Sequence, residues 1–189
     1  MSDAKADLSS LISRASAADR SVGRDWNPTL CGEFDLRIAR SGTWYYEGSP
    51  IRRSQLVALF ASILRRERDG FYYLVTSVEK LRIQVDCLPF IAVEVTCEGS
   101  GQTQILSFRT NVGESVVADA EHPIVVTADS TTGEPLPSVR VRDGLSALLT
   151  RSVYYELVEL GEETQVEDRT VCRVWSCDRF FELGDYAVP

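Results

Sequence analysis

The segment from Gly42 to Val75 constrains the fold of this chain more than any other stretch. It begins with alternating residues, which is the period of a β-strand that places Trp44 and Tyr46 on one face. A run of residues that is rich in aromatic and β-branched side chains, Phe71 to Thr76, favours a second strand. Between them lies an apolar stripe at helical spacing, formed by Leu56, Leu59, Phe60, Ile63 and Leu64. The segment therefore predicts a strand–helix–strand unit.

Residues typical of helix termini flank this stripe. Ser49 followed by Pro50 fits a helix start, and a start near Ser54 is the alternative. Arginines at positions 65, 66 and 68 occupy the expected last turn, where the helix dipole favours cations. Asp69-Gly70 follows as a stop signal. The pattern predicts a helix that continues to Arg68.

A weaker copy of this pattern lies between Ile124 and Val158. Leu145, Leu148 and Leu149 repeat the spacing of the first three stripe residues, and Tyr154-Tyr155 repeats the position of Tyr72-Tyr73 after the stripe. We interpret the copy as an internal duplication of a strand–helix–strand unit. Chance is the alternative, because any amphipathic helix between strands gives similar spacing.

Short alternating segments separated by turn residues fill most of the remaining chain. They predict an α+β fold of mostly antiparallel strands, in bent or barrel-like sheets that each carry one helix. A short amphipathic helix is expected over Ala4–Ala18, and Cys87-Leu88-Pro89 interrupts the strand pattern. We predict a helical extension (1–22), an N-terminal α+β unit (23–87) and a C-terminal barrel-like unit with one helix (88–189). The expected strands include Phe90–Cys97 (with Ile91, Val93 and Val95 inward) and Ile124–Thr127, with an acidic turn at Gly161–Glu163. Three hairpins are also expected: Phe34–Ile38 with the Trp44 strand around a turn at residues 40–42, Phe71–Thr76 with Leu81–Val85, and a closing hairpin of Val171–Ser176 with Arg179–Leu183.

Charge and apolar content exclude several classes of partner. The net charge of −8 argues against a nucleic-acid polymer, because binding a phosphate backbone needs a basic surface. No apolar run approaches the length of a membrane span, and the first residues lack the pattern of a signal peptide. The five cysteines are an odd number without framework spacing, so we expect free thiols. These features predict a cytoplasmic protein without membrane contact.

Motifs that carry catalysis or bind metals are scarce. His122 is the only histidine and lies in a polar stretch without a nucleophile motif, which favours a surface or capping role. The cysteines form no Cys-x-x-Cys pair, and no phosphate-binding glycine loop is present. We therefore predict a non-enzymatic protein without a metal or cofactor. An enzyme that uses carboxylate or thiol chemistry is the weakest alternative.

Seven aromatic and cationic side chains are the candidate ligand-binding residues. Rings can stack on a flat ligand, and cations can pair with a phosphate or carboxylate. The alternatives are a place in the core for the rings and ion pairs with the abundant acids for the cations. Arg53 corresponds to Arg140 if the copies are aligned by Pro-x-x-Arg, and to Arg142 if they are aligned by the leucines. The candidates are Trp44, Tyr46, Arg53, Lys80, Arg140, Arg142 and Trp175.

Several of these residues belong to motifs that resemble one bacterial family. The most specific motif is Gly-x-Trp-x-Tyr-x-Gly-Ser-Pro-Ile at residues 42–51. Others are Trp26-x-Pro28, Cys31-Gly32, Asp69-Gly70, Glu79-Lys80, Val141-Arg142-x-Gly144-Leu145 and Trp175-Ser176-x-x-x-Phe180-Phe181. Together they resemble the family termed domain of unknown function 1285 (DUF1285) over most of the chain after Ser21. The resemblance implies a duplicated α+β fold with a pleckstrin-homology-like C-terminal half, a small-ligand or nucleotide site between the halves, and a role in signal transduction.

The residues and the resemblance lead to one functional prediction. We expect a non-enzymatic binding or sensor module that holds an anionic, nucleotide-like small molecule between the two units. The alternative is a protein–protein interaction or scaffold domain, which an exposed apolar patch would favour.

Overall fold

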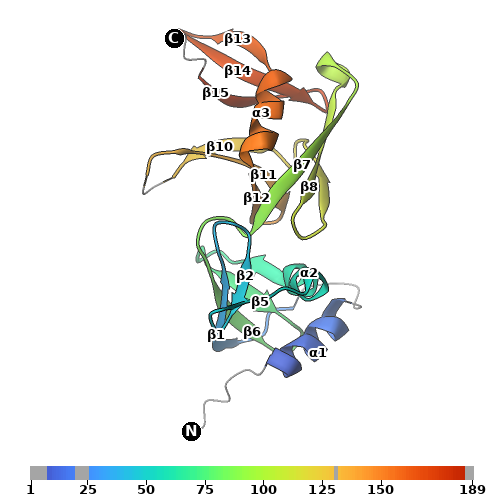
Figure 1. Ribbon diagram of the computed structural model, residues 1–189, viewed down its shortest axis with the longest axis vertical. Helices are drawn as coiled ribbons and strands as arrows, with labels where there is room; N and C mark the ends of the chain where they lie inside the picture. Colours follow the sequence, from blue (N-terminus) through green and yellow to red (C-terminus); the bar gives the residue numbers. More distant parts are fainter. Residues whose placement is uncertain (1–7, 20–25, 130–131, 186–189) are drawn as a thin grey trace. The chain divides into compact units, whose positions relative to one another are not determined.

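The computed structural model describes residues 8–19, 26–129 and 132–185 (Figure 1). The chain divides into two compact units, Met1–Cys87 and Leu88–Pro189. The described residues form three α-helices and are otherwise mostly strands, so the predicted α+β class is confirmed. No helix in these ranges is long and apolar enough to cross a membrane. Residues 4–7 of the helix predicted over Ala4–Ala18 lie outside the described residues.

Unit 1 contains one six-stranded sheet, sheet A, and two helices. Its strands lie in the order β3-β2-β1-β6-β5-β4, and every neighbouring pair is antiparallel except β1 and β6, which are parallel. Figure 1 shows both helices on one side of the sheet, where α1 packs against α2. The elements are α1 (Leu8–Asp19), β1 (Leu30–Ile38), β2 (Trp44–Tyr46), β3 (Ser49–Pro50), α2 (Ser54–Ser62), β4 (Leu64–Arg66), β5 (Tyr72–Val75) and β6 (Lys80–Val85).

The core of unit 1 follows from the alternation along its strands. Along β1, Phe34, Leu36 and Ile38 are buried, whereas the residues between them are exposed. Trp44 lies opposite Ile38 and is also buried, as the shared face of Trp44 and Tyr46 predicts. The helices contribute Leu11, Ala15, Phe60 and Ala61 to the buried set. One face of sheet A therefore carries the core, and the other carries polar side chains.

The predicted helix of unit 1 is too long at both ends. Ser49 and Pro50 form strand β3, so the alternative start near Ser54 is the correct one. The helix ends at Ser62, and the arginines expected in its last turn lie in or after β4, which pairs with β5 through Leu64 and Leu74. Leu64 is buried in this ladder. Pairing with the next strand thus overrides the helical spacing of Ile63 and Leu64, because local periodicity is a weak constraint where strand pairing competes.

Unit 2 contains a second six-stranded sheet, sheet B, which is bent into a half-barrel. Its strands lie in the order β10-β11-β12-β7-β8-β9, again with one parallel pair, β12 and β7. A bulge between Ala92 and Glu94 shifts the alternation in β7, so the prediction of Val93 as an inward residue is wrong and it is 37% exposed. The strands are β7 (Phe90–Glu98), β8 (Ile105–Thr110), β9 (Ser115–Val117), β10 (Ile124–Ala128), β11 (Pro135–Arg142) and β12 (Leu145–Leu149), and a 3-10 turn, η1, spans Gly101–Thr103.

The rest of unit 2 is helix α3 (Arg151–Glu159) and a three-stranded sheet, sheet C. Thr150 caps α3, since its hydroxyl oxygen accepts a hydrogen bond from the Val153 backbone N–H. Val153 and Leu157 are buried, and α3 packs on β7 and β14. The strands of sheet C are β13 (Glu162–Val166), β14 (Arg169–Ser176) and β15 (Arg179–Asp185). The predicted closing hairpin is confirmed, whereas the predicted acidic turn at Gly161–Glu163 is wrong because β13 begins there.

The second strand–helix–strand copy was placed in the wrong register. Leu145, Leu148 and Leu149 form strand β12, and Tyr154-Tyr155, predicted as a strand, lies in α3. The physical reason is the parallel ladder of β12 with β7, in which Leu145, Ala147 and Leu149 are the buried residues. A period of two therefore describes these leucines better than a helical period does.

The two six-stranded sheets nevertheless share one topology. Each consists of two three-strand meanders, and the first strand of one meander pairs in parallel with the last strand of the other. Strands β1 to β6 thus correspond in order to β7 to β12. Helix α2 lies between the meanders of sheet A, whereas a helix-free connection, residues 118–123, takes that place in sheet B. The shared topology supports duplication, with an equivalence that differs from the one predicted.

Candidate functional site

A cleft of about 900 Å³ opens on unit 1. Residues of β1, β2 and β6 and the segment Gly70–Tyr72 line it. Its charged and aromatic side chains include Glu33, Asp35, Arg37, Tyr45, Phe71 and Arg82. A smaller groove of about 360 Å³ lies on unit 2 between β10 and β15.

Strand register places the polar lining of the cleft on one face of sheet A. Glu33, Asp35 and Arg37 alternate along β1 and are exposed. Arg37 lies opposite Tyr45 of β2, and Glu33 lies opposite Arg82 of β6. Because paired residues of neighbouring strands project to the same face, these side chains share the face opposite to the core.

Arg37 and Asp86 form a two-pronged ion pair beside the cleft. The Nε and Nη2 atoms of Arg37 lie 2.9 and 2.5 Å from the two carboxylate oxygens of Asp86. The hydrogen bond from Arg37 lowers the pKa of Asp86, and the same contact raises the pKa of Arg37. The pair uses two of the five N–H donors of the guanidinium.

Arg82 lies against an aromatic ring. Its guanidinium carbon is 3.5 Å from the ring centroid of Phe71, and Phe71 is 44% exposed. The Glu33 carboxylate is 3.9 Å from the Arg82 guanidinium, which is the outer limit of an ion pair. This arrangement is a cation–π contact at the wall of the cleft.

A second cation–ring pair continues along the same face. The Lys80 ammonium lies 4.7 Å from the ring centroid of Tyr73 and 3.3 Å from a carboxylate oxygen of Glu67. The Tyr73 hydroxyl donates a hydrogen bond of 2.7 Å to Asp69. That bond raises the pKa of Tyr73 and lowers the pKa of Asp69. The cations of β6 are therefore held by neighbouring rings and acids.

The four predicted site residues of unit 1 have different environments. Trp44 is 1% exposed and belongs to the core, where its indole N–H has no acceptor. Tyr46 lines the cleft and stacks on Phe34 with a centroid distance of 5.2 Å. Lys80 makes the contacts described above. Arg53 is exposed at the N-terminus of α2, and its side chain makes no capping hydrogen bond.

The three predicted site residues of unit 2 lie in separate neighbourhoods. Arg140 is exposed on β11. Arg142 pairs with Glu114, and its guanidinium lies 5.4 Å from the ring centroid of Phe90. Trp175 stacks on Phe180 with a centroid distance of 3.5 Å, and Phe180 lines the groove of unit 2.

The sequence analysis did not select most of the residues that line the cleft. The available signal was the polar alternation Glu33-x-Asp35-x-Arg37 in β1 and Lys80-x-Arg82-x-Gln84 in β6. Such alternation indicates a solvent-facing strand surface. It does not indicate which strands become neighbours. Here β1 and β6 pair in parallel, and the ion pair between Arg37 and Asp86 beside them spans 49 positions of sequence.

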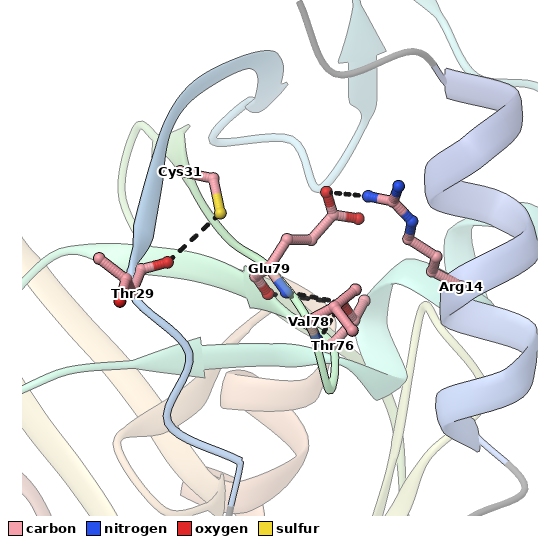
Figure 2. A network of polar contacts seen from close by, with 6 residues as sticks. All are labelled: Arg14, Thr29, Cys31, Thr76, Val78 and Glu79. Atoms are coloured by element: carbon pink, nitrogen blue, oxygen red, sulfur yellow. Dashed lines mark hydrogen bonds and ion pairs between the residues drawn. The ribbon is translucent and has the colours of Figure 1, made fainter. Parts of the chain in front are cut away.

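A buried carboxylate lies elsewhere in unit 1. Glu79 is 5% exposed, and its Oε2 atom lies 2.6 Å from Nη1 of Arg14. Its Oε1 atom is buried and has no hydrogen-bond donor among the residues that the structure describes. Figure 2 shows Glu79 directed toward Arg14 on α1, while Cys31 lies on the other side with its sulfur toward Thr29. The contact ties α1 to the turn that precedes β6.

His122 makes only local contacts. Its Nδ1 atom lies 3.0 Å from Asp119, which also accepts hydrogen bonds from the backbone N–H groups of Glu121 and His122. These are the contacts of a surface turn. Within the part of the chain that the structure describes, no three His, Cys, Asp or Glu side chains converge as metal ligands would.

Comparison with known proteins identifies related chains. The DUF1285 N-terminal domain model matches residues 23–88, and the DUF1285 C-terminal domain model matches residues 89–183. A crystal structure of a DUF1285 family protein from Silicibacter pomeroyi DSS-3 is 46% identical and covers 90% of this chain and 94% of its own, with a TM-score of 0.78. A crystal structure of a DUF1285 family protein from Shewanella baltica OS155 is 26% identical and covers 66% of this chain and 91% of its own, with a TM-score of 0.51. No curated protein matches. Both domain models and the two crystal structures agree, and the chain belongs to the DUF1285 family.

Proposed function

We propose that this protein is a non-enzymatic module that binds a small ligand in the cleft of unit 1. The observation that carries the proposal is the cleft itself, whose volume of about 900 Å³ lies within the range of small-molecule sites. It combines exposed ionic groups with the partly exposed ring of Phe71. These groups project from paired strands, and strands hold side chains more rigidly than loops do.

The chemistry of the lining supports binding over catalysis. Its ionisable groups are carboxylates, guanidinium groups and tyrosines, and among the described residues no His, Cys, Ser, Thr or Lys lines it. A covalent mechanism would need a nucleophile with an adjacent base, and these are the side chains that most often supply them. An enzyme that uses the carboxylates alone remains the weaker alternative.

The proposal can be tested with the full chain in solution. Calorimetry with a panel of nucleotides, amino acids and amines would measure affinity, and amide shifts in ¹H–¹⁵N spectra would locate the ligand. We expect shifts in β1, β2 and β6, and weaker binding in Arg82→Ala. Arg109→Ala is the matched control, since Arg109 is an exposed strand arginine of unit 2 that also pairs with a glutamate. Absence of any ligand tighter than millimolar, or shifts outside the cleft, would refute the proposal.

An anionic, nucleotide-like ligand with a role in bacterial signal transduction is a separate proposal, because the arginines that support it do not line the cleft. Arg53 on unit 1 and Arg140 on unit 2 each offer an exposed guanidinium group that makes no ion pair with the residues that the structure describes. A pleckstrin-homology-like arrangement of unit 2 is likewise proposed, on the basis of its half-barrel and helix α3. Calorimetry with the nucleotides of the panel, repeated with Arg53→Ala, tests whether Arg53 binds an anionic ligand. An unchanged nucleotide affinity in the variant argues against this role of Arg53.

A protein-interaction domain is the second candidate function. The groove of unit 2 favours it, because Val125 and Phe180 are exposed on its walls and β10 is an edge strand of sheet B. Edge strands can pair with an added strand from a partner. A stoichiometric partner recovered with the wild-type chain and lost with Val125→Glu would support this function.

A further inference from the structure

We propose that the groove of unit 2 binds an extended segment of a partner protein, which adds to the free edge of β10 as a further strand. The segment carries apolar side chains toward the groove and basic residues at its ends. This inference rests on the second candidate function, since it names the kind of partner that the groove takes. It is independent of the cleft of unit 1.

The ladder between β10 and β11 leaves one set of backbone groups of β10 without a partner. In an antiparallel pair, every second residue exchanges its backbone hydrogen bonds with the opposite strand, and the residues between them point away. The Arg140 N–H donates to the Pro123 carbonyl, and the register continues this bonded set with Val125. The N–H and C=O groups of Ile124 and Val126 therefore project from the free edge, where none of the described residues bonds to them.

The groove lies along this free edge. Ile124, Val125 and Val126 line it on one side, and residues of β15 line the other side. Strand β15 is itself an edge strand of sheet C and lies beside β10, but within the described ranges no ladder joins the two (Figure 1). Ile124 is only 4% exposed, so bulk water reaches its backbone groups poorly. Backbone groups without a partner cost free energy in such a place, and an added strand would satisfy them.

The walls of the groove fit apolar side chains. Val125 is 43% exposed and Phe180 is 36% exposed, and both line the groove. The ring of Phe180 is supported from behind by its stack with Trp175. The volume of about 360 Å³ is small for a binding site, so the groove has room for the side chains of one short segment. Because side chains alternate along a strand, every second residue of the segment would face these walls.

The charge of unit 2 favours a basic partner. The unit contains seventeen acidic and seven basic residues, a formal charge of −10, whereas the whole chain has a charge of −8. Glu121 precedes β10 and Asp129 follows it, so carboxylates flank both ends of the free edge. In the groove, Arg169 is compensated by Glu182 and Asp185 at 2.9 and 2.7 Å. Lysine or arginine at the ends of the segment would therefore be attracted, and carboxylates would be repelled.

The test uses two synthetic peptides with opposite charges at their ends. The probe is acetyl-Lys-Val-Thr-Val-Thr-Val-Lys-amide, and its counterpart carries glutamate in place of both lysines. In ¹H–¹⁵N titrations of the full chain, we expect the lysine peptide to shift the amides of β10 and β15 and the glutamate peptide to bind roughly fivefold more weakly. Hydrogen exchange of the Ile124 and Val126 amides should slow in the complex. Exchange at Val125, which already bonds to β11, should stay the same.

A proline substitution on β10 tests the backbone contact. Val126→Pro removes a donor of the free edge and no hydrogen bond of the β11 ladder, because the Val126 N–H points away from β11. It should weaken binding of the lysine peptide roughly two- to tenfold, as expected for one lost hydrogen bond. Val117→Pro is the matched control and should not change the affinity. Val117 is an exposed valine of β9, the other edge strand of sheet B, and its N–H also points away from its ladder.

The outcomes separate this inference from the second candidate function. If the lysine peptide leaves the β10 amides unshifted while Val125→Glu still loses a stoichiometric partner, the inference fails and the interaction function stands. If the peptide binds without slowing exchange at Ile124 and Val126, strand addition is wrong, and this readout needs only the wild-type chain. Equal affinity for both peptides overturns the basic ends of the segment.

Two further outcomes concern the occupant. A concentration-dependent dimer of the chain alone in analytical ultracentrifugation, lost in Val126→Pro but kept in Val117→Pro, would make a second copy the occupant and overturn the assignment to a partner protein. If neither peptide binds and no partner depends on Val125, both the inference and the second candidate function fail.

Discussion

Removal of Arg14 should destabilise unit 1 by leaving a buried charge without a partner. Glu79 has only 7% of its side chain exposed, and Arg14 is the cation that contacts it. Breaking a fully buried ion pair costs about 3–5 kcal/mol. The Arg14 side chain is 47% exposed, so solvent screens part of the interaction, and we expect Arg14→Ala to cost about 1–3 kcal/mol.

Substitution of Glu79, the partner of Arg14, should lower the free energy of unfolding less than Arg14→Ala does. Glu79→Gln keeps the shape and removes the charge, and its amide oxygen can still accept the hydrogen bond from Arg14. Because the carboxylate then no longer has to be desolvated, Glu79→Gln should cost about 1 kcal/mol or less. The double variant Arg14→Ala/Glu79→Gln should be more stable than Arg14→Ala alone. That non-additivity is the signature of a coupled pair.

Urea unfolding of the intact chain measures this cycle. Trp44 in unit 1 and Trp175 in unit 2 are fluorescent reporters, and hydrogen exchange of α1 followed by mass spectrometry shows whether the helix opens locally. Arg109→Ala provides the control, because its exposed pair with Glu94 should contribute under about 1 kcal/mol. Equal and additive effects of Arg14→Ala and Glu79→Gln would refute the argument that Arg14 compensates the buried charge of Glu79.

Three further predictions concern single residues. Ser176→Ala should lower the free energy of unfolding by about 1–3 kcal/mol in urea melts. The buried hydroxyl group donates a hydrogen bond of 2.7 Å to the Ala118 carbonyl and accepts one of 3.0 Å from the Leu106 N–H. A loss below about 0.5 kcal/mol would contradict this prediction. The hydrogen bond from Arg37 lowers the pKa of Asp86 in the folded state. Ionised Asp86 therefore stabilises the fold at pH values above its unfolded pKa, near 3.8, and this stabilisation is lost as the pH falls through the lower pKa of the folded state. Carboxyl NMR titration should show the pKa of Asp86 rising in Arg37→Ala, and an unchanged value would count against the ion pair in solution. Phe60→Ala should cost about 3–5 kcal/mol, since Phe60 is fully buried in α2, and a loss under about 1 kcal/mol would argue against its place in the core.

Local patterns alone were sufficient for several elements of this fold. The alternation of Phe34–Ile38 and the turn at residues 40–42 identified the β1–β2 hairpin, because an antiparallel hairpin is encoded within one short segment. The hairpins formed by β5 and β6 and by β14 and β15 were identified for the same reason. The shared face of Trp44 and Tyr46 also followed from a period of two, whereas the burial of Trp44 became evident only from the structure.

Strand pairing decided what the local patterns misjudged. Leu64–Arg66 and Leu145–Leu149 carry leucines that fit a helix and a strand equally well. The ladder with the next strand, β5, selects the strand for the first segment, and the ladder with the distant strand β7 selects it for the second. The duplication was predicted, but its correct equivalence became evident only from the order of strands in each sheet. Periodicity cannot encode a partner strand that lies far along the chain.

For the candidate site, too, the sequence determined some features and the tertiary structure decided others. The sequence by itself determined that Glu33, Asp35 and Arg37 alternate on one strand face, and that the chain lacks the common metal and nucleophile motifs. Only the tertiary structure decided that β6 lies beside β1, that Arg37 is held by Asp86 and Arg82 by Phe71, and that Asp35 is left without an ion pair among the described residues. The physical reason is that a side chain's charge is a property of its residue, whereas its compensation depends on neighbours that parallel pairing brings from far along the chain.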